Sequence, residues 1–159
     1  MLYEFLLVFT IVLAGLMVGN ELSVALFLHP TLRRFHDNLH AQARREFAEL
    51  FGRVMPFWYI AVALSSIALT WLGPPFRSTA GRLLLASTIV WLLTIVYTII
   101  LPAPLNSRIA AWKLESVPSD WMAQERRWDT LHAIRMFMLV AALLCLVLAG
   151  VSANGFAGA

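Results

Sequence analysis

The segment FLLVFTIVLAGLMVGNELSVALFLHP, residues 5–30, is an apolar run that carries a carboxylate near its end. A membrane-spanning helix needs roughly 20 largely apolar residues, and residues 5–28 meet that length. Glu21 lies about two helical turns before Leu28, too deep for its short side chain to reach water. Such a carboxylate usually faces the interior of a bundle, where it finds a partner or marks a functional site. We therefore expect further spanning helices that supply a polar partner for Glu21.

The composition places the whole chain in a membrane. Of its 159 residues, 60% are hydrophobic and 13% are charged, whereas a soluble domain carries about 25% charged residues. The one cysteine, Cys145, lies in an apolar run, which excludes a disulfide framework and a cysteine-based metal site. The pI is near 9.6, but the basic residues cluster at the ends of apolar runs. We interpret them as residues that determine how the chain is oriented in the membrane. Nucleic acid is not an expected partner.

Four apolar runs predict four spanning helices, at residues 5–28, 57–72, 83–101 and 133–151. No segment has the alternating pattern of membrane barrel strands, so helices are the arrangement that satisfies the backbone in lipid. The prediction is an all-α fold, a membrane-spanning up-down-up-down four-helix bundle with helical cytoplasmic extensions. It forms one domain over residues 1–152, followed by a short tail at residues 153–159.

The basic residues predict the orientation. The link at residues 73–82 holds two of them, whereas the two long connections hold five each: Arg33, Arg34, Arg44, Arg45 and Arg53 in one, and Arg108, Lys113, Arg126, Arg127 and Arg135 in the other. Because cytoplasmic loops carry the excess of Lys and Arg, both long connections should be cytoplasmic and both termini outside. The small size and the arginine-rich inner loops favour a bacterial inner membrane.

The long connections are expected to be partly helical. In residues 47–54 the apolar side chains recur at i, i+3, i+4 and i+7, which predicts a cytoplasmic extension of the second helix. Pro56 fits a position near the beginning of that helix. Ser119 is the predicted N-cap of a helix that runs unbroken into the fourth span. Pro102 and Pro104 are predicted to end the third helix at its inner end.

The helix directions bring the candidate polar residues to one level. Trp128, His132 and Arg135 stand at i, i+4 and i+7, so they share one face of the fourth helix. Arg135 is the deepest of the three and is the natural partner for Glu21. His29, at the end of the first helix, and His132 then lie a turn or two nearer the cytoplasm.

Other segments reach the same level. The third helix passes Tyr97 there, and the break PAPLNSR at residues 102–108 places Asn106 close by. Asn20 is expected to form hydrogen bonds between helices. Tyr59 and Trp91 are interpreted as interface anchors or lipid-facing packing. The convergence in the cytoplasmic half predicts a binding or reaction site, with a hydrophobic small molecule and the bilayer as expected partners; the oligomeric state is left open.

Three kinds of function fit these residues. Two histidines and a carboxylate suit iron, copper or zinc, with His29, His132 and Glu21 as ligands. Against this, Glu21 and His29 lie about 12 Å apart along a continuous helix, so they share an ion only if the helix breaks. Metal-free acid–base chemistry at His132, tuned by Asp129 or Glu21, is equally open. In a non-catalytic protein the pair of Glu21 and Arg135 would hold the helices in register.

Four segments together resemble a known family. They are NELSVALFLHPTL (residues 20–32), RVMP (53–56), PLNSRIAAW (104–112) and RRWDTLHAIR (126–135). The chain is similar, over nearly its whole length and in the same order, to the anthrone-oxygenase-like family of small four-helix membrane proteins. The most specific pieces are the Pro-Leu-Asn-x-Arg turn at residues 104–108 and the Arg-Trp-Asp…His…Arg run at residues 127–135. The enzymes that name the family oxidise an anthrone to an anthraquinone with dioxygen and are described as needing no added cofactor.

The resemblance implies an interior polar site and a function. The implied site consists of Asn20, Glu21, His29, Asn106, Arg127, Trp128, His132 and Arg135. The expected protein is an integral membrane oxidoreductase that oxidises a hydrophobic phenolic or polyketide-like molecule with dioxygen. His132 or Glu21 would deprotonate the substrate, and Arg135 or Asn106 would stabilise the oxyanion. Asn20, Tyr97, Trp128 and Arg127 would bind the substrate, whose identity the resemblance does not fix.

Overall fold

The computed structural model describes residues 1–155, except the side chains of residues 114, 154 and 155, and the regular secondary structure of this part is helical throughout. Four segments are long and apolar enough to cross a membrane: Leu2–Leu32, Asp37–Leu72, Thr79–Ile100 and Trp121–Ala153. This confirms the predicted all-α fold with four candidate membrane-spanning helices. It indicates an integral membrane protein.

The first span consists of three helical pieces. Helix α1 (Leu2–Ser23) continues through a π-helical turn, η1 (Val24–Leu28), into the short α2 (His29–Leu32). The remaining elements are α3 (Asp37–Leu72), α4 (Thr79–Ile100), α5 (Pro102–Ala110), a 3₁₀ turn η2 (Leu114–Ser116) and α6 (Trp121–Gly155). The predicted spans 5–28, 57–72 and 133–151 lie inside these helices, and 83–101 passes the end of α4 by one residue.

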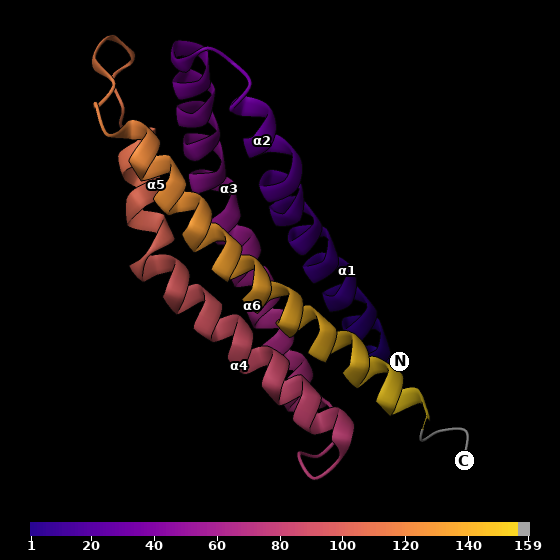
Figure 1. Cartoon of the computed structure of the whole chain (residues 1–159). Coiled ribbons are helices and arrows are strands. Elements are labelled where there is room, and N and C mark those ends of the chain that lie inside the picture. The colour runs from indigo at the N-terminus through magenta and orange to yellow at the C-terminus, as the bar shows by residue number, and fades with distance from the viewer. Residues whose placement is uncertain (156–159) are drawn as a thin grey trace.

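The helices form an elongated bundle (Figure 1). The start of α1, the link between α3 and α4 and the end of α6 lie at one end of the bundle, and the α2–α3 link and the loop between α5 and α6 lie at the other. Helix α6 packs against α1, α4 and α5, and α3 packs against α1, α4 and α5. Residues far apart in the sequence, such as Glu21 and Arg135, can therefore meet in the interior.

Helix α3 is 36 residues long and begins well before the second apolar run. The predicted helical extension is therefore confirmed. The interpretation of Pro56 as a residue near the helix start is wrong, because Pro56 lies in the interior of α3. An interior proline removes one backbone hydrogen bond, and membrane helices tolerate this because neighbouring groups satisfy the freed carbonyl.

The break after the third span is also confirmed. Helix α4 ends at Ile100, and the chain resumes as α5 with Pro102 in its first turn, where the fixed φ of proline suits a helix. Helix α6 begins at Trp121, one residue later than an N-cap at Ser119 implies, and runs unbroken to Gly155. Residues 153–155, expected in the tail, are thus helical, and residues 156–159 of that tail lie outside the described residues.

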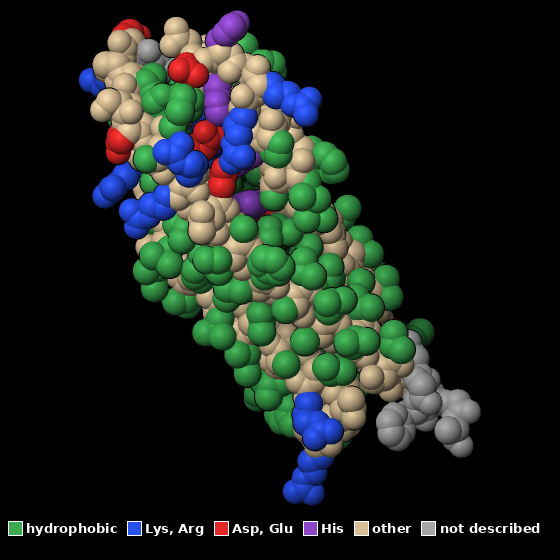
Figure 2. Space-filling view, viewed as in Figure 1, with side chains coloured by type: hydrophobic (Ala, Val, Ile, Leu, Met, Phe, Trp, Pro, Cys, Tyr) green, Lys and Arg blue, Asp and Glu red, His purple; other side chains and the backbone are tan. Residues whose placement is uncertain are grey.

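The surface and the core fit a lipid environment. Large apolar side chains point outward in the middle of the bundle, with Phe57 76% and Phe137 80% exposed. Figure 2 shows this apolar belt, and it shows most charged side chains gathered at the end with the α2–α3 link. Inside, small polar groups join helices: Ser87 Oγ donates to the carbonyl of Ala142 at 2.8 Å. Such hydrogen bonds between helices are common in membrane bundles.

Candidate functional site

The buried carboxylate of Glu21 is held by two other helices. Glu21 is 3% exposed. The Tyr59 hydroxyl, from α3, donates to Glu21 Oε1 at 3.0 Å, and Arg135 Nη2, from α6, donates to Glu21 Oε2 at 2.7 Å. The predicted pairing of Glu21 with Arg135 is confirmed. Charge-assisted hydrogen bonds of this kind are stronger than neutral ones, so they fix both side chains.

His132 is fixed by hydrogen bonds at both ring nitrogens. Its Nε2 lies 3.0 Å from the backbone carbonyl of Glu21, and Arg135 Nη2 lies 2.8 Å from its Nδ1. The carbonyl can only accept and the guanidinium can only donate. These partners therefore assign His132 as a neutral imidazole that donates from Nε2 and accepts at Nδ1. His132 thus binds both members of the ion pair.

The helix type changes within one turn after Glu21, because α1 ends at Ser23. The N–H of Val24 already reaches two carbonyls, those of Asn20 and Glu21, and the π-helical turn η1 follows. Single π-turns inside α-helices are rare and are often found at functional sites. The chain stays helical through η1, so Glu21 and His29 remain apart along it. His29 pairs instead with Asp129, whose Oδ1 lies 2.5 Å from His29 Nδ1.

The predicted metal ligands do not form a cluster. Glu21 Oε2 lies 3.2 Å from His132 Nδ1, but the ring centroids of His29 and His132 are 6.3 Å apart. Within residues 1–155, no group of three or more His, Cys, Asp and Glu side chains is arranged to hold a metal ion. The structure therefore does not arrange His29, His132 and Glu21 around one metal position, and this ligand set remains a prediction.

Trp128 forms an aromatic layer beside the ion pair. Its ring stacks on that of His132, with centroids 4.6 Å apart and an interplanar angle of 13°, and the His29 ring lies 4.8 Å away. The guanidinium of Arg44 lies 4.3 Å from the Trp128 ring centroid. The guanidinium of Arg135 lies 5.9 Å from the same centroid. Trp128 therefore contacts two buried cations by the attraction between a cation and an aromatic face.

Arg44 is the residue that the sequence analysis missed most clearly. It was counted among the loop charges, yet it is 1% exposed. Its Nε and Nη2 atoms have no hydrogen-bond partner among the described residues. A signal for this burial exists in the sequence: Ala41, Arg44 and Ala48 share one face of α3, and all three are buried. Two small residues on the same face as an arginine leave room for its side chain inside the bundle.

A cavity of about 250 Å³ lies among α3, α4, α5 and α6 next to the ion pair. Most of its wall is apolar, and its polar side chains include Tyr59, Asn106, Trp128 and Arg135. Glu21 and His132 lie behind this wall. Arg135 and Trp128 line the cavity, and one buried donor of each, Arg135 Nε and Trp128 Nε1, has no hydrogen-bond partner in the described part of the chain. Buried donors are nearly always paired in proteins, so these two atoms suit a ligand oxygen.

Prolines and a glycine shape this cavity. Pro56, in the interior of α3, and Pro102, in the first turn of α5, both line it. Asn106 Nδ2 donates to the carbonyl of Ala48 at 2.7 Å. Gly52 permits this approach, since a Cβ atom there would lie 3.3 Å from Asn106 Nδ2. The close contact of α3 with α5 therefore holds Asn106 at the cavity.

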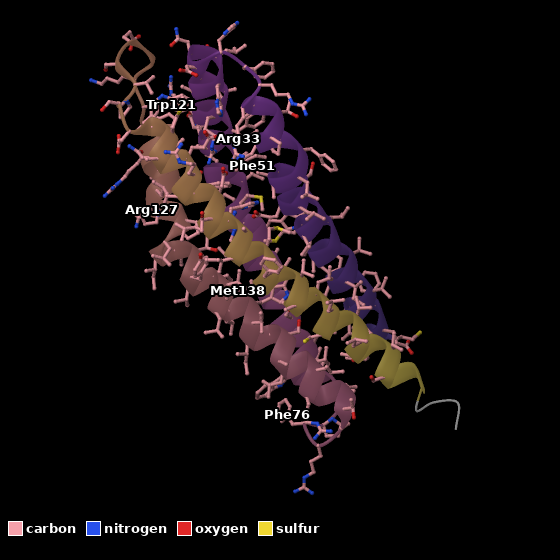
Figure 3. All side chains as sticks on the ribbon, in the orientation of Figure 1. Arg33, Phe51, Phe76, Trp121, Arg127 and Met138 are labelled. Carbon is pink, nitrogen blue, oxygen red and sulfur yellow. The ribbon has the colours of Figure 1, made fainter. Side chains whose placement is uncertain are left out.

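The other predicted substrate-binding residues lie elsewhere. Asn20 is half-buried, with its Nδ2 3.7 Å from the sulfur of Met55. The Tyr97 hydroxyl donates to the carbonyl of Leu131 at 3.1 Å, which joins α4 to α6. Arg127 is exposed on the outside of the bundle (Figure 3). None of these three residues lines the cavity.

The interpretation of Tyr59 and Trp91 as interface anchors or lipid-facing packing is wrong. Tyr59 is 5% exposed and Trp91 is fully buried, and their rings pack edge to face at 6.3 Å. Aromatic residues in a span resemble interface anchors in sequence, and the hydrogen bond to Glu21 appears only once the helices pack.

A second group of ionisable side chains lies nearer the polar end. His40 Nε2 and Glu125 Oε1 are 2.9 Å apart, and both residues are buried. Arg33 pairs with Asp129 in the same region. His40, Glu125, Arg33 and Asp129 tie α2 and α3 to α6 at the polar end of the bundle.

Fold and site together define a class of protein: a four-helix membrane protein with a buried carboxylate, guanidinium and imidazole beside a mostly apolar cavity. A family model described as anthrone oxygenase matches residues 47–145, more than half of the chain. The chain belongs to the anthrone oxygenase family, which confirms the resemblance found in the sequence. The matched residues include Tyr59, Asn106 and Arg135, whereas Glu21 and Arg44 precede them. Comparison with curated proteins and with solved structures gave no match.

Proposed function

We propose that this protein is an integral membrane oxidoreductase that oxidises a hydrophobic phenolic or polyketide-like molecule with dioxygen. One observation carries the proposal: Glu21 and His132 fix the guanidinium of Arg135, which lines a mostly apolar cavity and whose Nε has no hydrogen-bond partner among the described residues. A positively charged donor fixed in this way stabilises negative charge that develops on a substrate oxygen. The family to which the chain belongs supports the type of reaction.

The proposed reaction is balanced without a further oxidant. A base removes one proton from a ring methylene that is conjugated with a carbonyl, and the electron pair moves onto the carbonyl oxygen. The carbanion form of this anion adds dioxygen, and the proton returns to give a hydroperoxide. The hydroperoxide loses water and leaves a ketone. The sum is one methylene group and one dioxygen converted to one carbonyl group and one water.

The geometry favours Glu21, acting through Tyr59, as the base. Tyr59 lines the cavity and donates its hydroxyl hydrogen to Glu21. The phenol oxygen can therefore take the substrate proton while its own proton moves to the carboxylate. Both nitrogens of His132 are engaged with Glu21 and Arg135. In this proposal His132 is a positioning residue rather than the base.

Arg135 makes this proton transfer less costly in a medium of low dielectric constant. Before the transfer the negative charge lies on Glu21, 2.7 Å from Arg135 Nη2. Afterwards it lies on the substrate oxygen, which we place beside Arg135 Nε and Trp128 Nε1. The negative charge thus stays next to the guanidinium of Arg135 throughout. Because this guanidinium neutralises the charge both on Glu21 and on the substrate oxygen, the transfer needs no new counterion.

We further propose that the site lies in the cytoplasmic half of the membrane. Most charged side chains gather at the end of the bundle with the α2–α3 link (Figure 2). By the excess of Lys and Arg there, that end faces the cytoplasm and both termini lie outside. A bacterial inner membrane is the proposed location.

The test is the oxidation of an anthrone by the purified protein in detergent or nanodiscs, followed as oxygen consumption and quinone absorbance. Glu21→Gln and Tyr59→Phe should each lower kcat/KM by about 10²–10⁴-fold, the usual contribution of a general base. The matched control is Tyr97→Phe, which removes a hydroxyl bonded to the Leu131 carbonyl, away from the cavity. Equal rates for Tyr59→Phe, Tyr97→Phe and the wild type would refute the proposed role of Tyr59. A folded wild-type protein without any turnover would favour the non-catalytic alternative.

A further inference from the structure

The cavity beside Arg135 reaches the outer surface of the bundle in the apolar belt. Its wall includes Ile60 of α3 and Ile99 of α4, which are 53% and 64% exposed. Both residues fall inside the predicted spans, 57–72 and 83–101. The cavity therefore opens between α3 and α4 at a level where the surroundings are lipid.

The cavity also extends toward the polar end. Gly52 of α3 and Ser107 of α5 line it there, and both are exposed. Both residues lie outside the predicted spans. The cavity thus has two openings, one that faces lipid and one that lies nearer the water. A ligand could reach Arg135 through either opening.

We propose that the substrate enters from the bilayer, sideways between α3 and α4, with Ile60 and Ile99 forming the sides of a portal. The wall near this opening is mostly apolar, with Met55, Pro56 and Ile95, and the hydroxyl of Thr98 there is bonded to the carbonyl of Thr94. A hydrophobic aromatic molecule partitions into the membrane, so its concentration is highest next to this opening. The identity of the ligand rests on the proposed function. The route rests on the shape of the cavity and on the exposure of Ile60 and Ile99 at its opening.

The side chains at the inner end of the cavity indicate which chemical groups a bound molecule must have. Arg135 and Trp128 line it there, and Arg135 Nε and Trp128 Nε1 are donors without partners among residues 1–155. A lipid acyl chain would leave both donors unpaired, and a buried unpaired donor is unfavourable. A membrane-dissolved aromatic molecule with oxygen atoms on its leading edge satisfies both donors. We therefore assign the cavity to such a molecule rather than to a resident phospholipid.

The test uses tryptophan substitutions that narrow one opening at a time, in protein reconstituted in nanodiscs. Ile60→Trp and Ile99→Trp narrow the lipid-facing opening, and Ser107→Trp narrows the opening nearer the water. Leu64→Trp and Val96→Trp are controls, because these residues are exposed on α3 and α4 but do not line the cavity. The probe is a hydroxyanthraquinone delivered in lipid vesicles, and its binding is followed as quenching of tryptophan fluorescence.

Ile60→Trp and Ile99→Trp should slow association of the probe and raise KM for an anthrone by about tenfold, with kcat unchanged. Leu64→Trp and Val96→Trp should leave both values within about twofold, and Ser107→Trp should slow association less than Ile60→Trp and Ile99→Trp do. The association rate in the wild type should follow the mole fraction of probe in the lipid. Slower association of the probe in Ser107→Trp alone, or an association rate that follows the concentration of the probe in water, would overturn the proposed portal.

The binding readout separates this inference from the proposed reaction. Portal-dependent binding of the probe by a wild-type protein that fails to oxidise an anthrone would support the route and reject the reaction. A wild-type protein that does not bind the probe would overturn the route. A phospholipid that stays bound after purification and is lost in Ile60→Trp would also overturn it, because the cavity would then be a lipid site.

Discussion

Arg135 and Arg44 are both guanidinium groups buried inside the bundle, yet different groups hold them. Arg135 lies in the fourth span and donates to a carboxylate and to an imidazole. Arg44 lies on the extension of α3, where the ring of Trp128 is 4.3 Å away and two of its nitrogens have no hydrogen-bond partner among residues 1–155. Trp128 lies near both, so the two sites share one aromatic ring.

The difference shows how depth in the membrane changes what a buried cation requires. In the span, a charge without a counterion is very unfavourable, so Arg135 and Glu21 depend on one another. Nearer the polar end, the face of the Trp128 indole stabilises Arg44. The negative charges of Asp129 and Glu125 also favour the Arg44 cation. Loss of one partner should therefore be severe at Arg135 and mild at Arg44.

The largest expected loss of stability comes from removing the shared ring. Trp128→Ala deletes a buried indole, which typically lowers the free energy of unfolding by about 3–5 kcal/mol. It also removes the aromatic face from Arg44, which adds up to about 2 kcal/mol. Unfolding in mixed micelles by SDS titration measures the loss. Trp128→Phe keeps an aromatic face and should retain most of the stability; equal losses for the two variants would show that the contact with Arg44 contributes little.

The next largest effect should follow from breaking the ion pair on one side. Glu21→Ala leaves Arg135 buried without its carboxylate, and loss of one partner of a buried pair lowers the free energy of unfolding by about 3–5 kcal/mol. The double variant Glu21→Ala, Arg135→Met removes both charges and should recover most of that loss. A single variant as stable as the wild type in the same SDS titration would contradict the view that the two charges depend on one another.

Much of this arrangement could be predicted from the sequence, and the reasons for the misses are physical. Hydropathy gives the four spans, and the depth of Glu21 predicts its pairing with Arg135, because a charge in lipid must be neutralised. Tyr59 was missed because a tyrosine in a span reads as an interface anchor whether it faces lipid or the interior. Arg44 was missed because a basic residue outside a span reads as an orientation signal, although its face of α3 is otherwise buried.

The shape of the cavity could not be predicted at all. Residues of α3, α4, α5 and α6 line it, so it forms only when these helices pack, and one of these residues, Pro56, was expected at a helix start rather than in its interior. Asn106 was predicted at the site, but its hydrogen bond to the Ala48 carbonyl requires the contact of α3 with α5. Long-range packing of this kind leaves no local periodicity in the sequence.

A small effect is expected at the second arginine. Arg44→Met replaces an incompletely hydrogen-bonded buried cation with an apolar side chain of similar length. The nearby carboxylates keep other partners, because Asp129 pairs with His29 and Arg33, and Glu125 pairs with His40. We expect the free energy of unfolding to change by less than about 1 kcal/mol in the same titration. Arg44→Lys should be worse than Arg44→Met, because an ammonium keeps the charge but loses the planar stacking on Trp128. A loss near 3 kcal/mol in Arg44→Met would show that Arg44 is paired as strongly as Arg135.

The smallest expected effect is that of a metal chelator. A histidine binds a metal through a free ring nitrogen, and both nitrogens of His132 are engaged, one with the carbonyl of Glu21 and one with Arg135. The nearby guanidinium groups of Arg135 and Arg44 also repel a cation from this position. We therefore expect purified protein to carry no stoichiometric iron, copper or zinc by elemental analysis, and EDTA to leave stability and turnover unchanged. Stoichiometric metal that disappears in His132→Ala would instead show that His132 is a ligand, and would require the hydrogen bonds of His132 to rearrange when the metal binds.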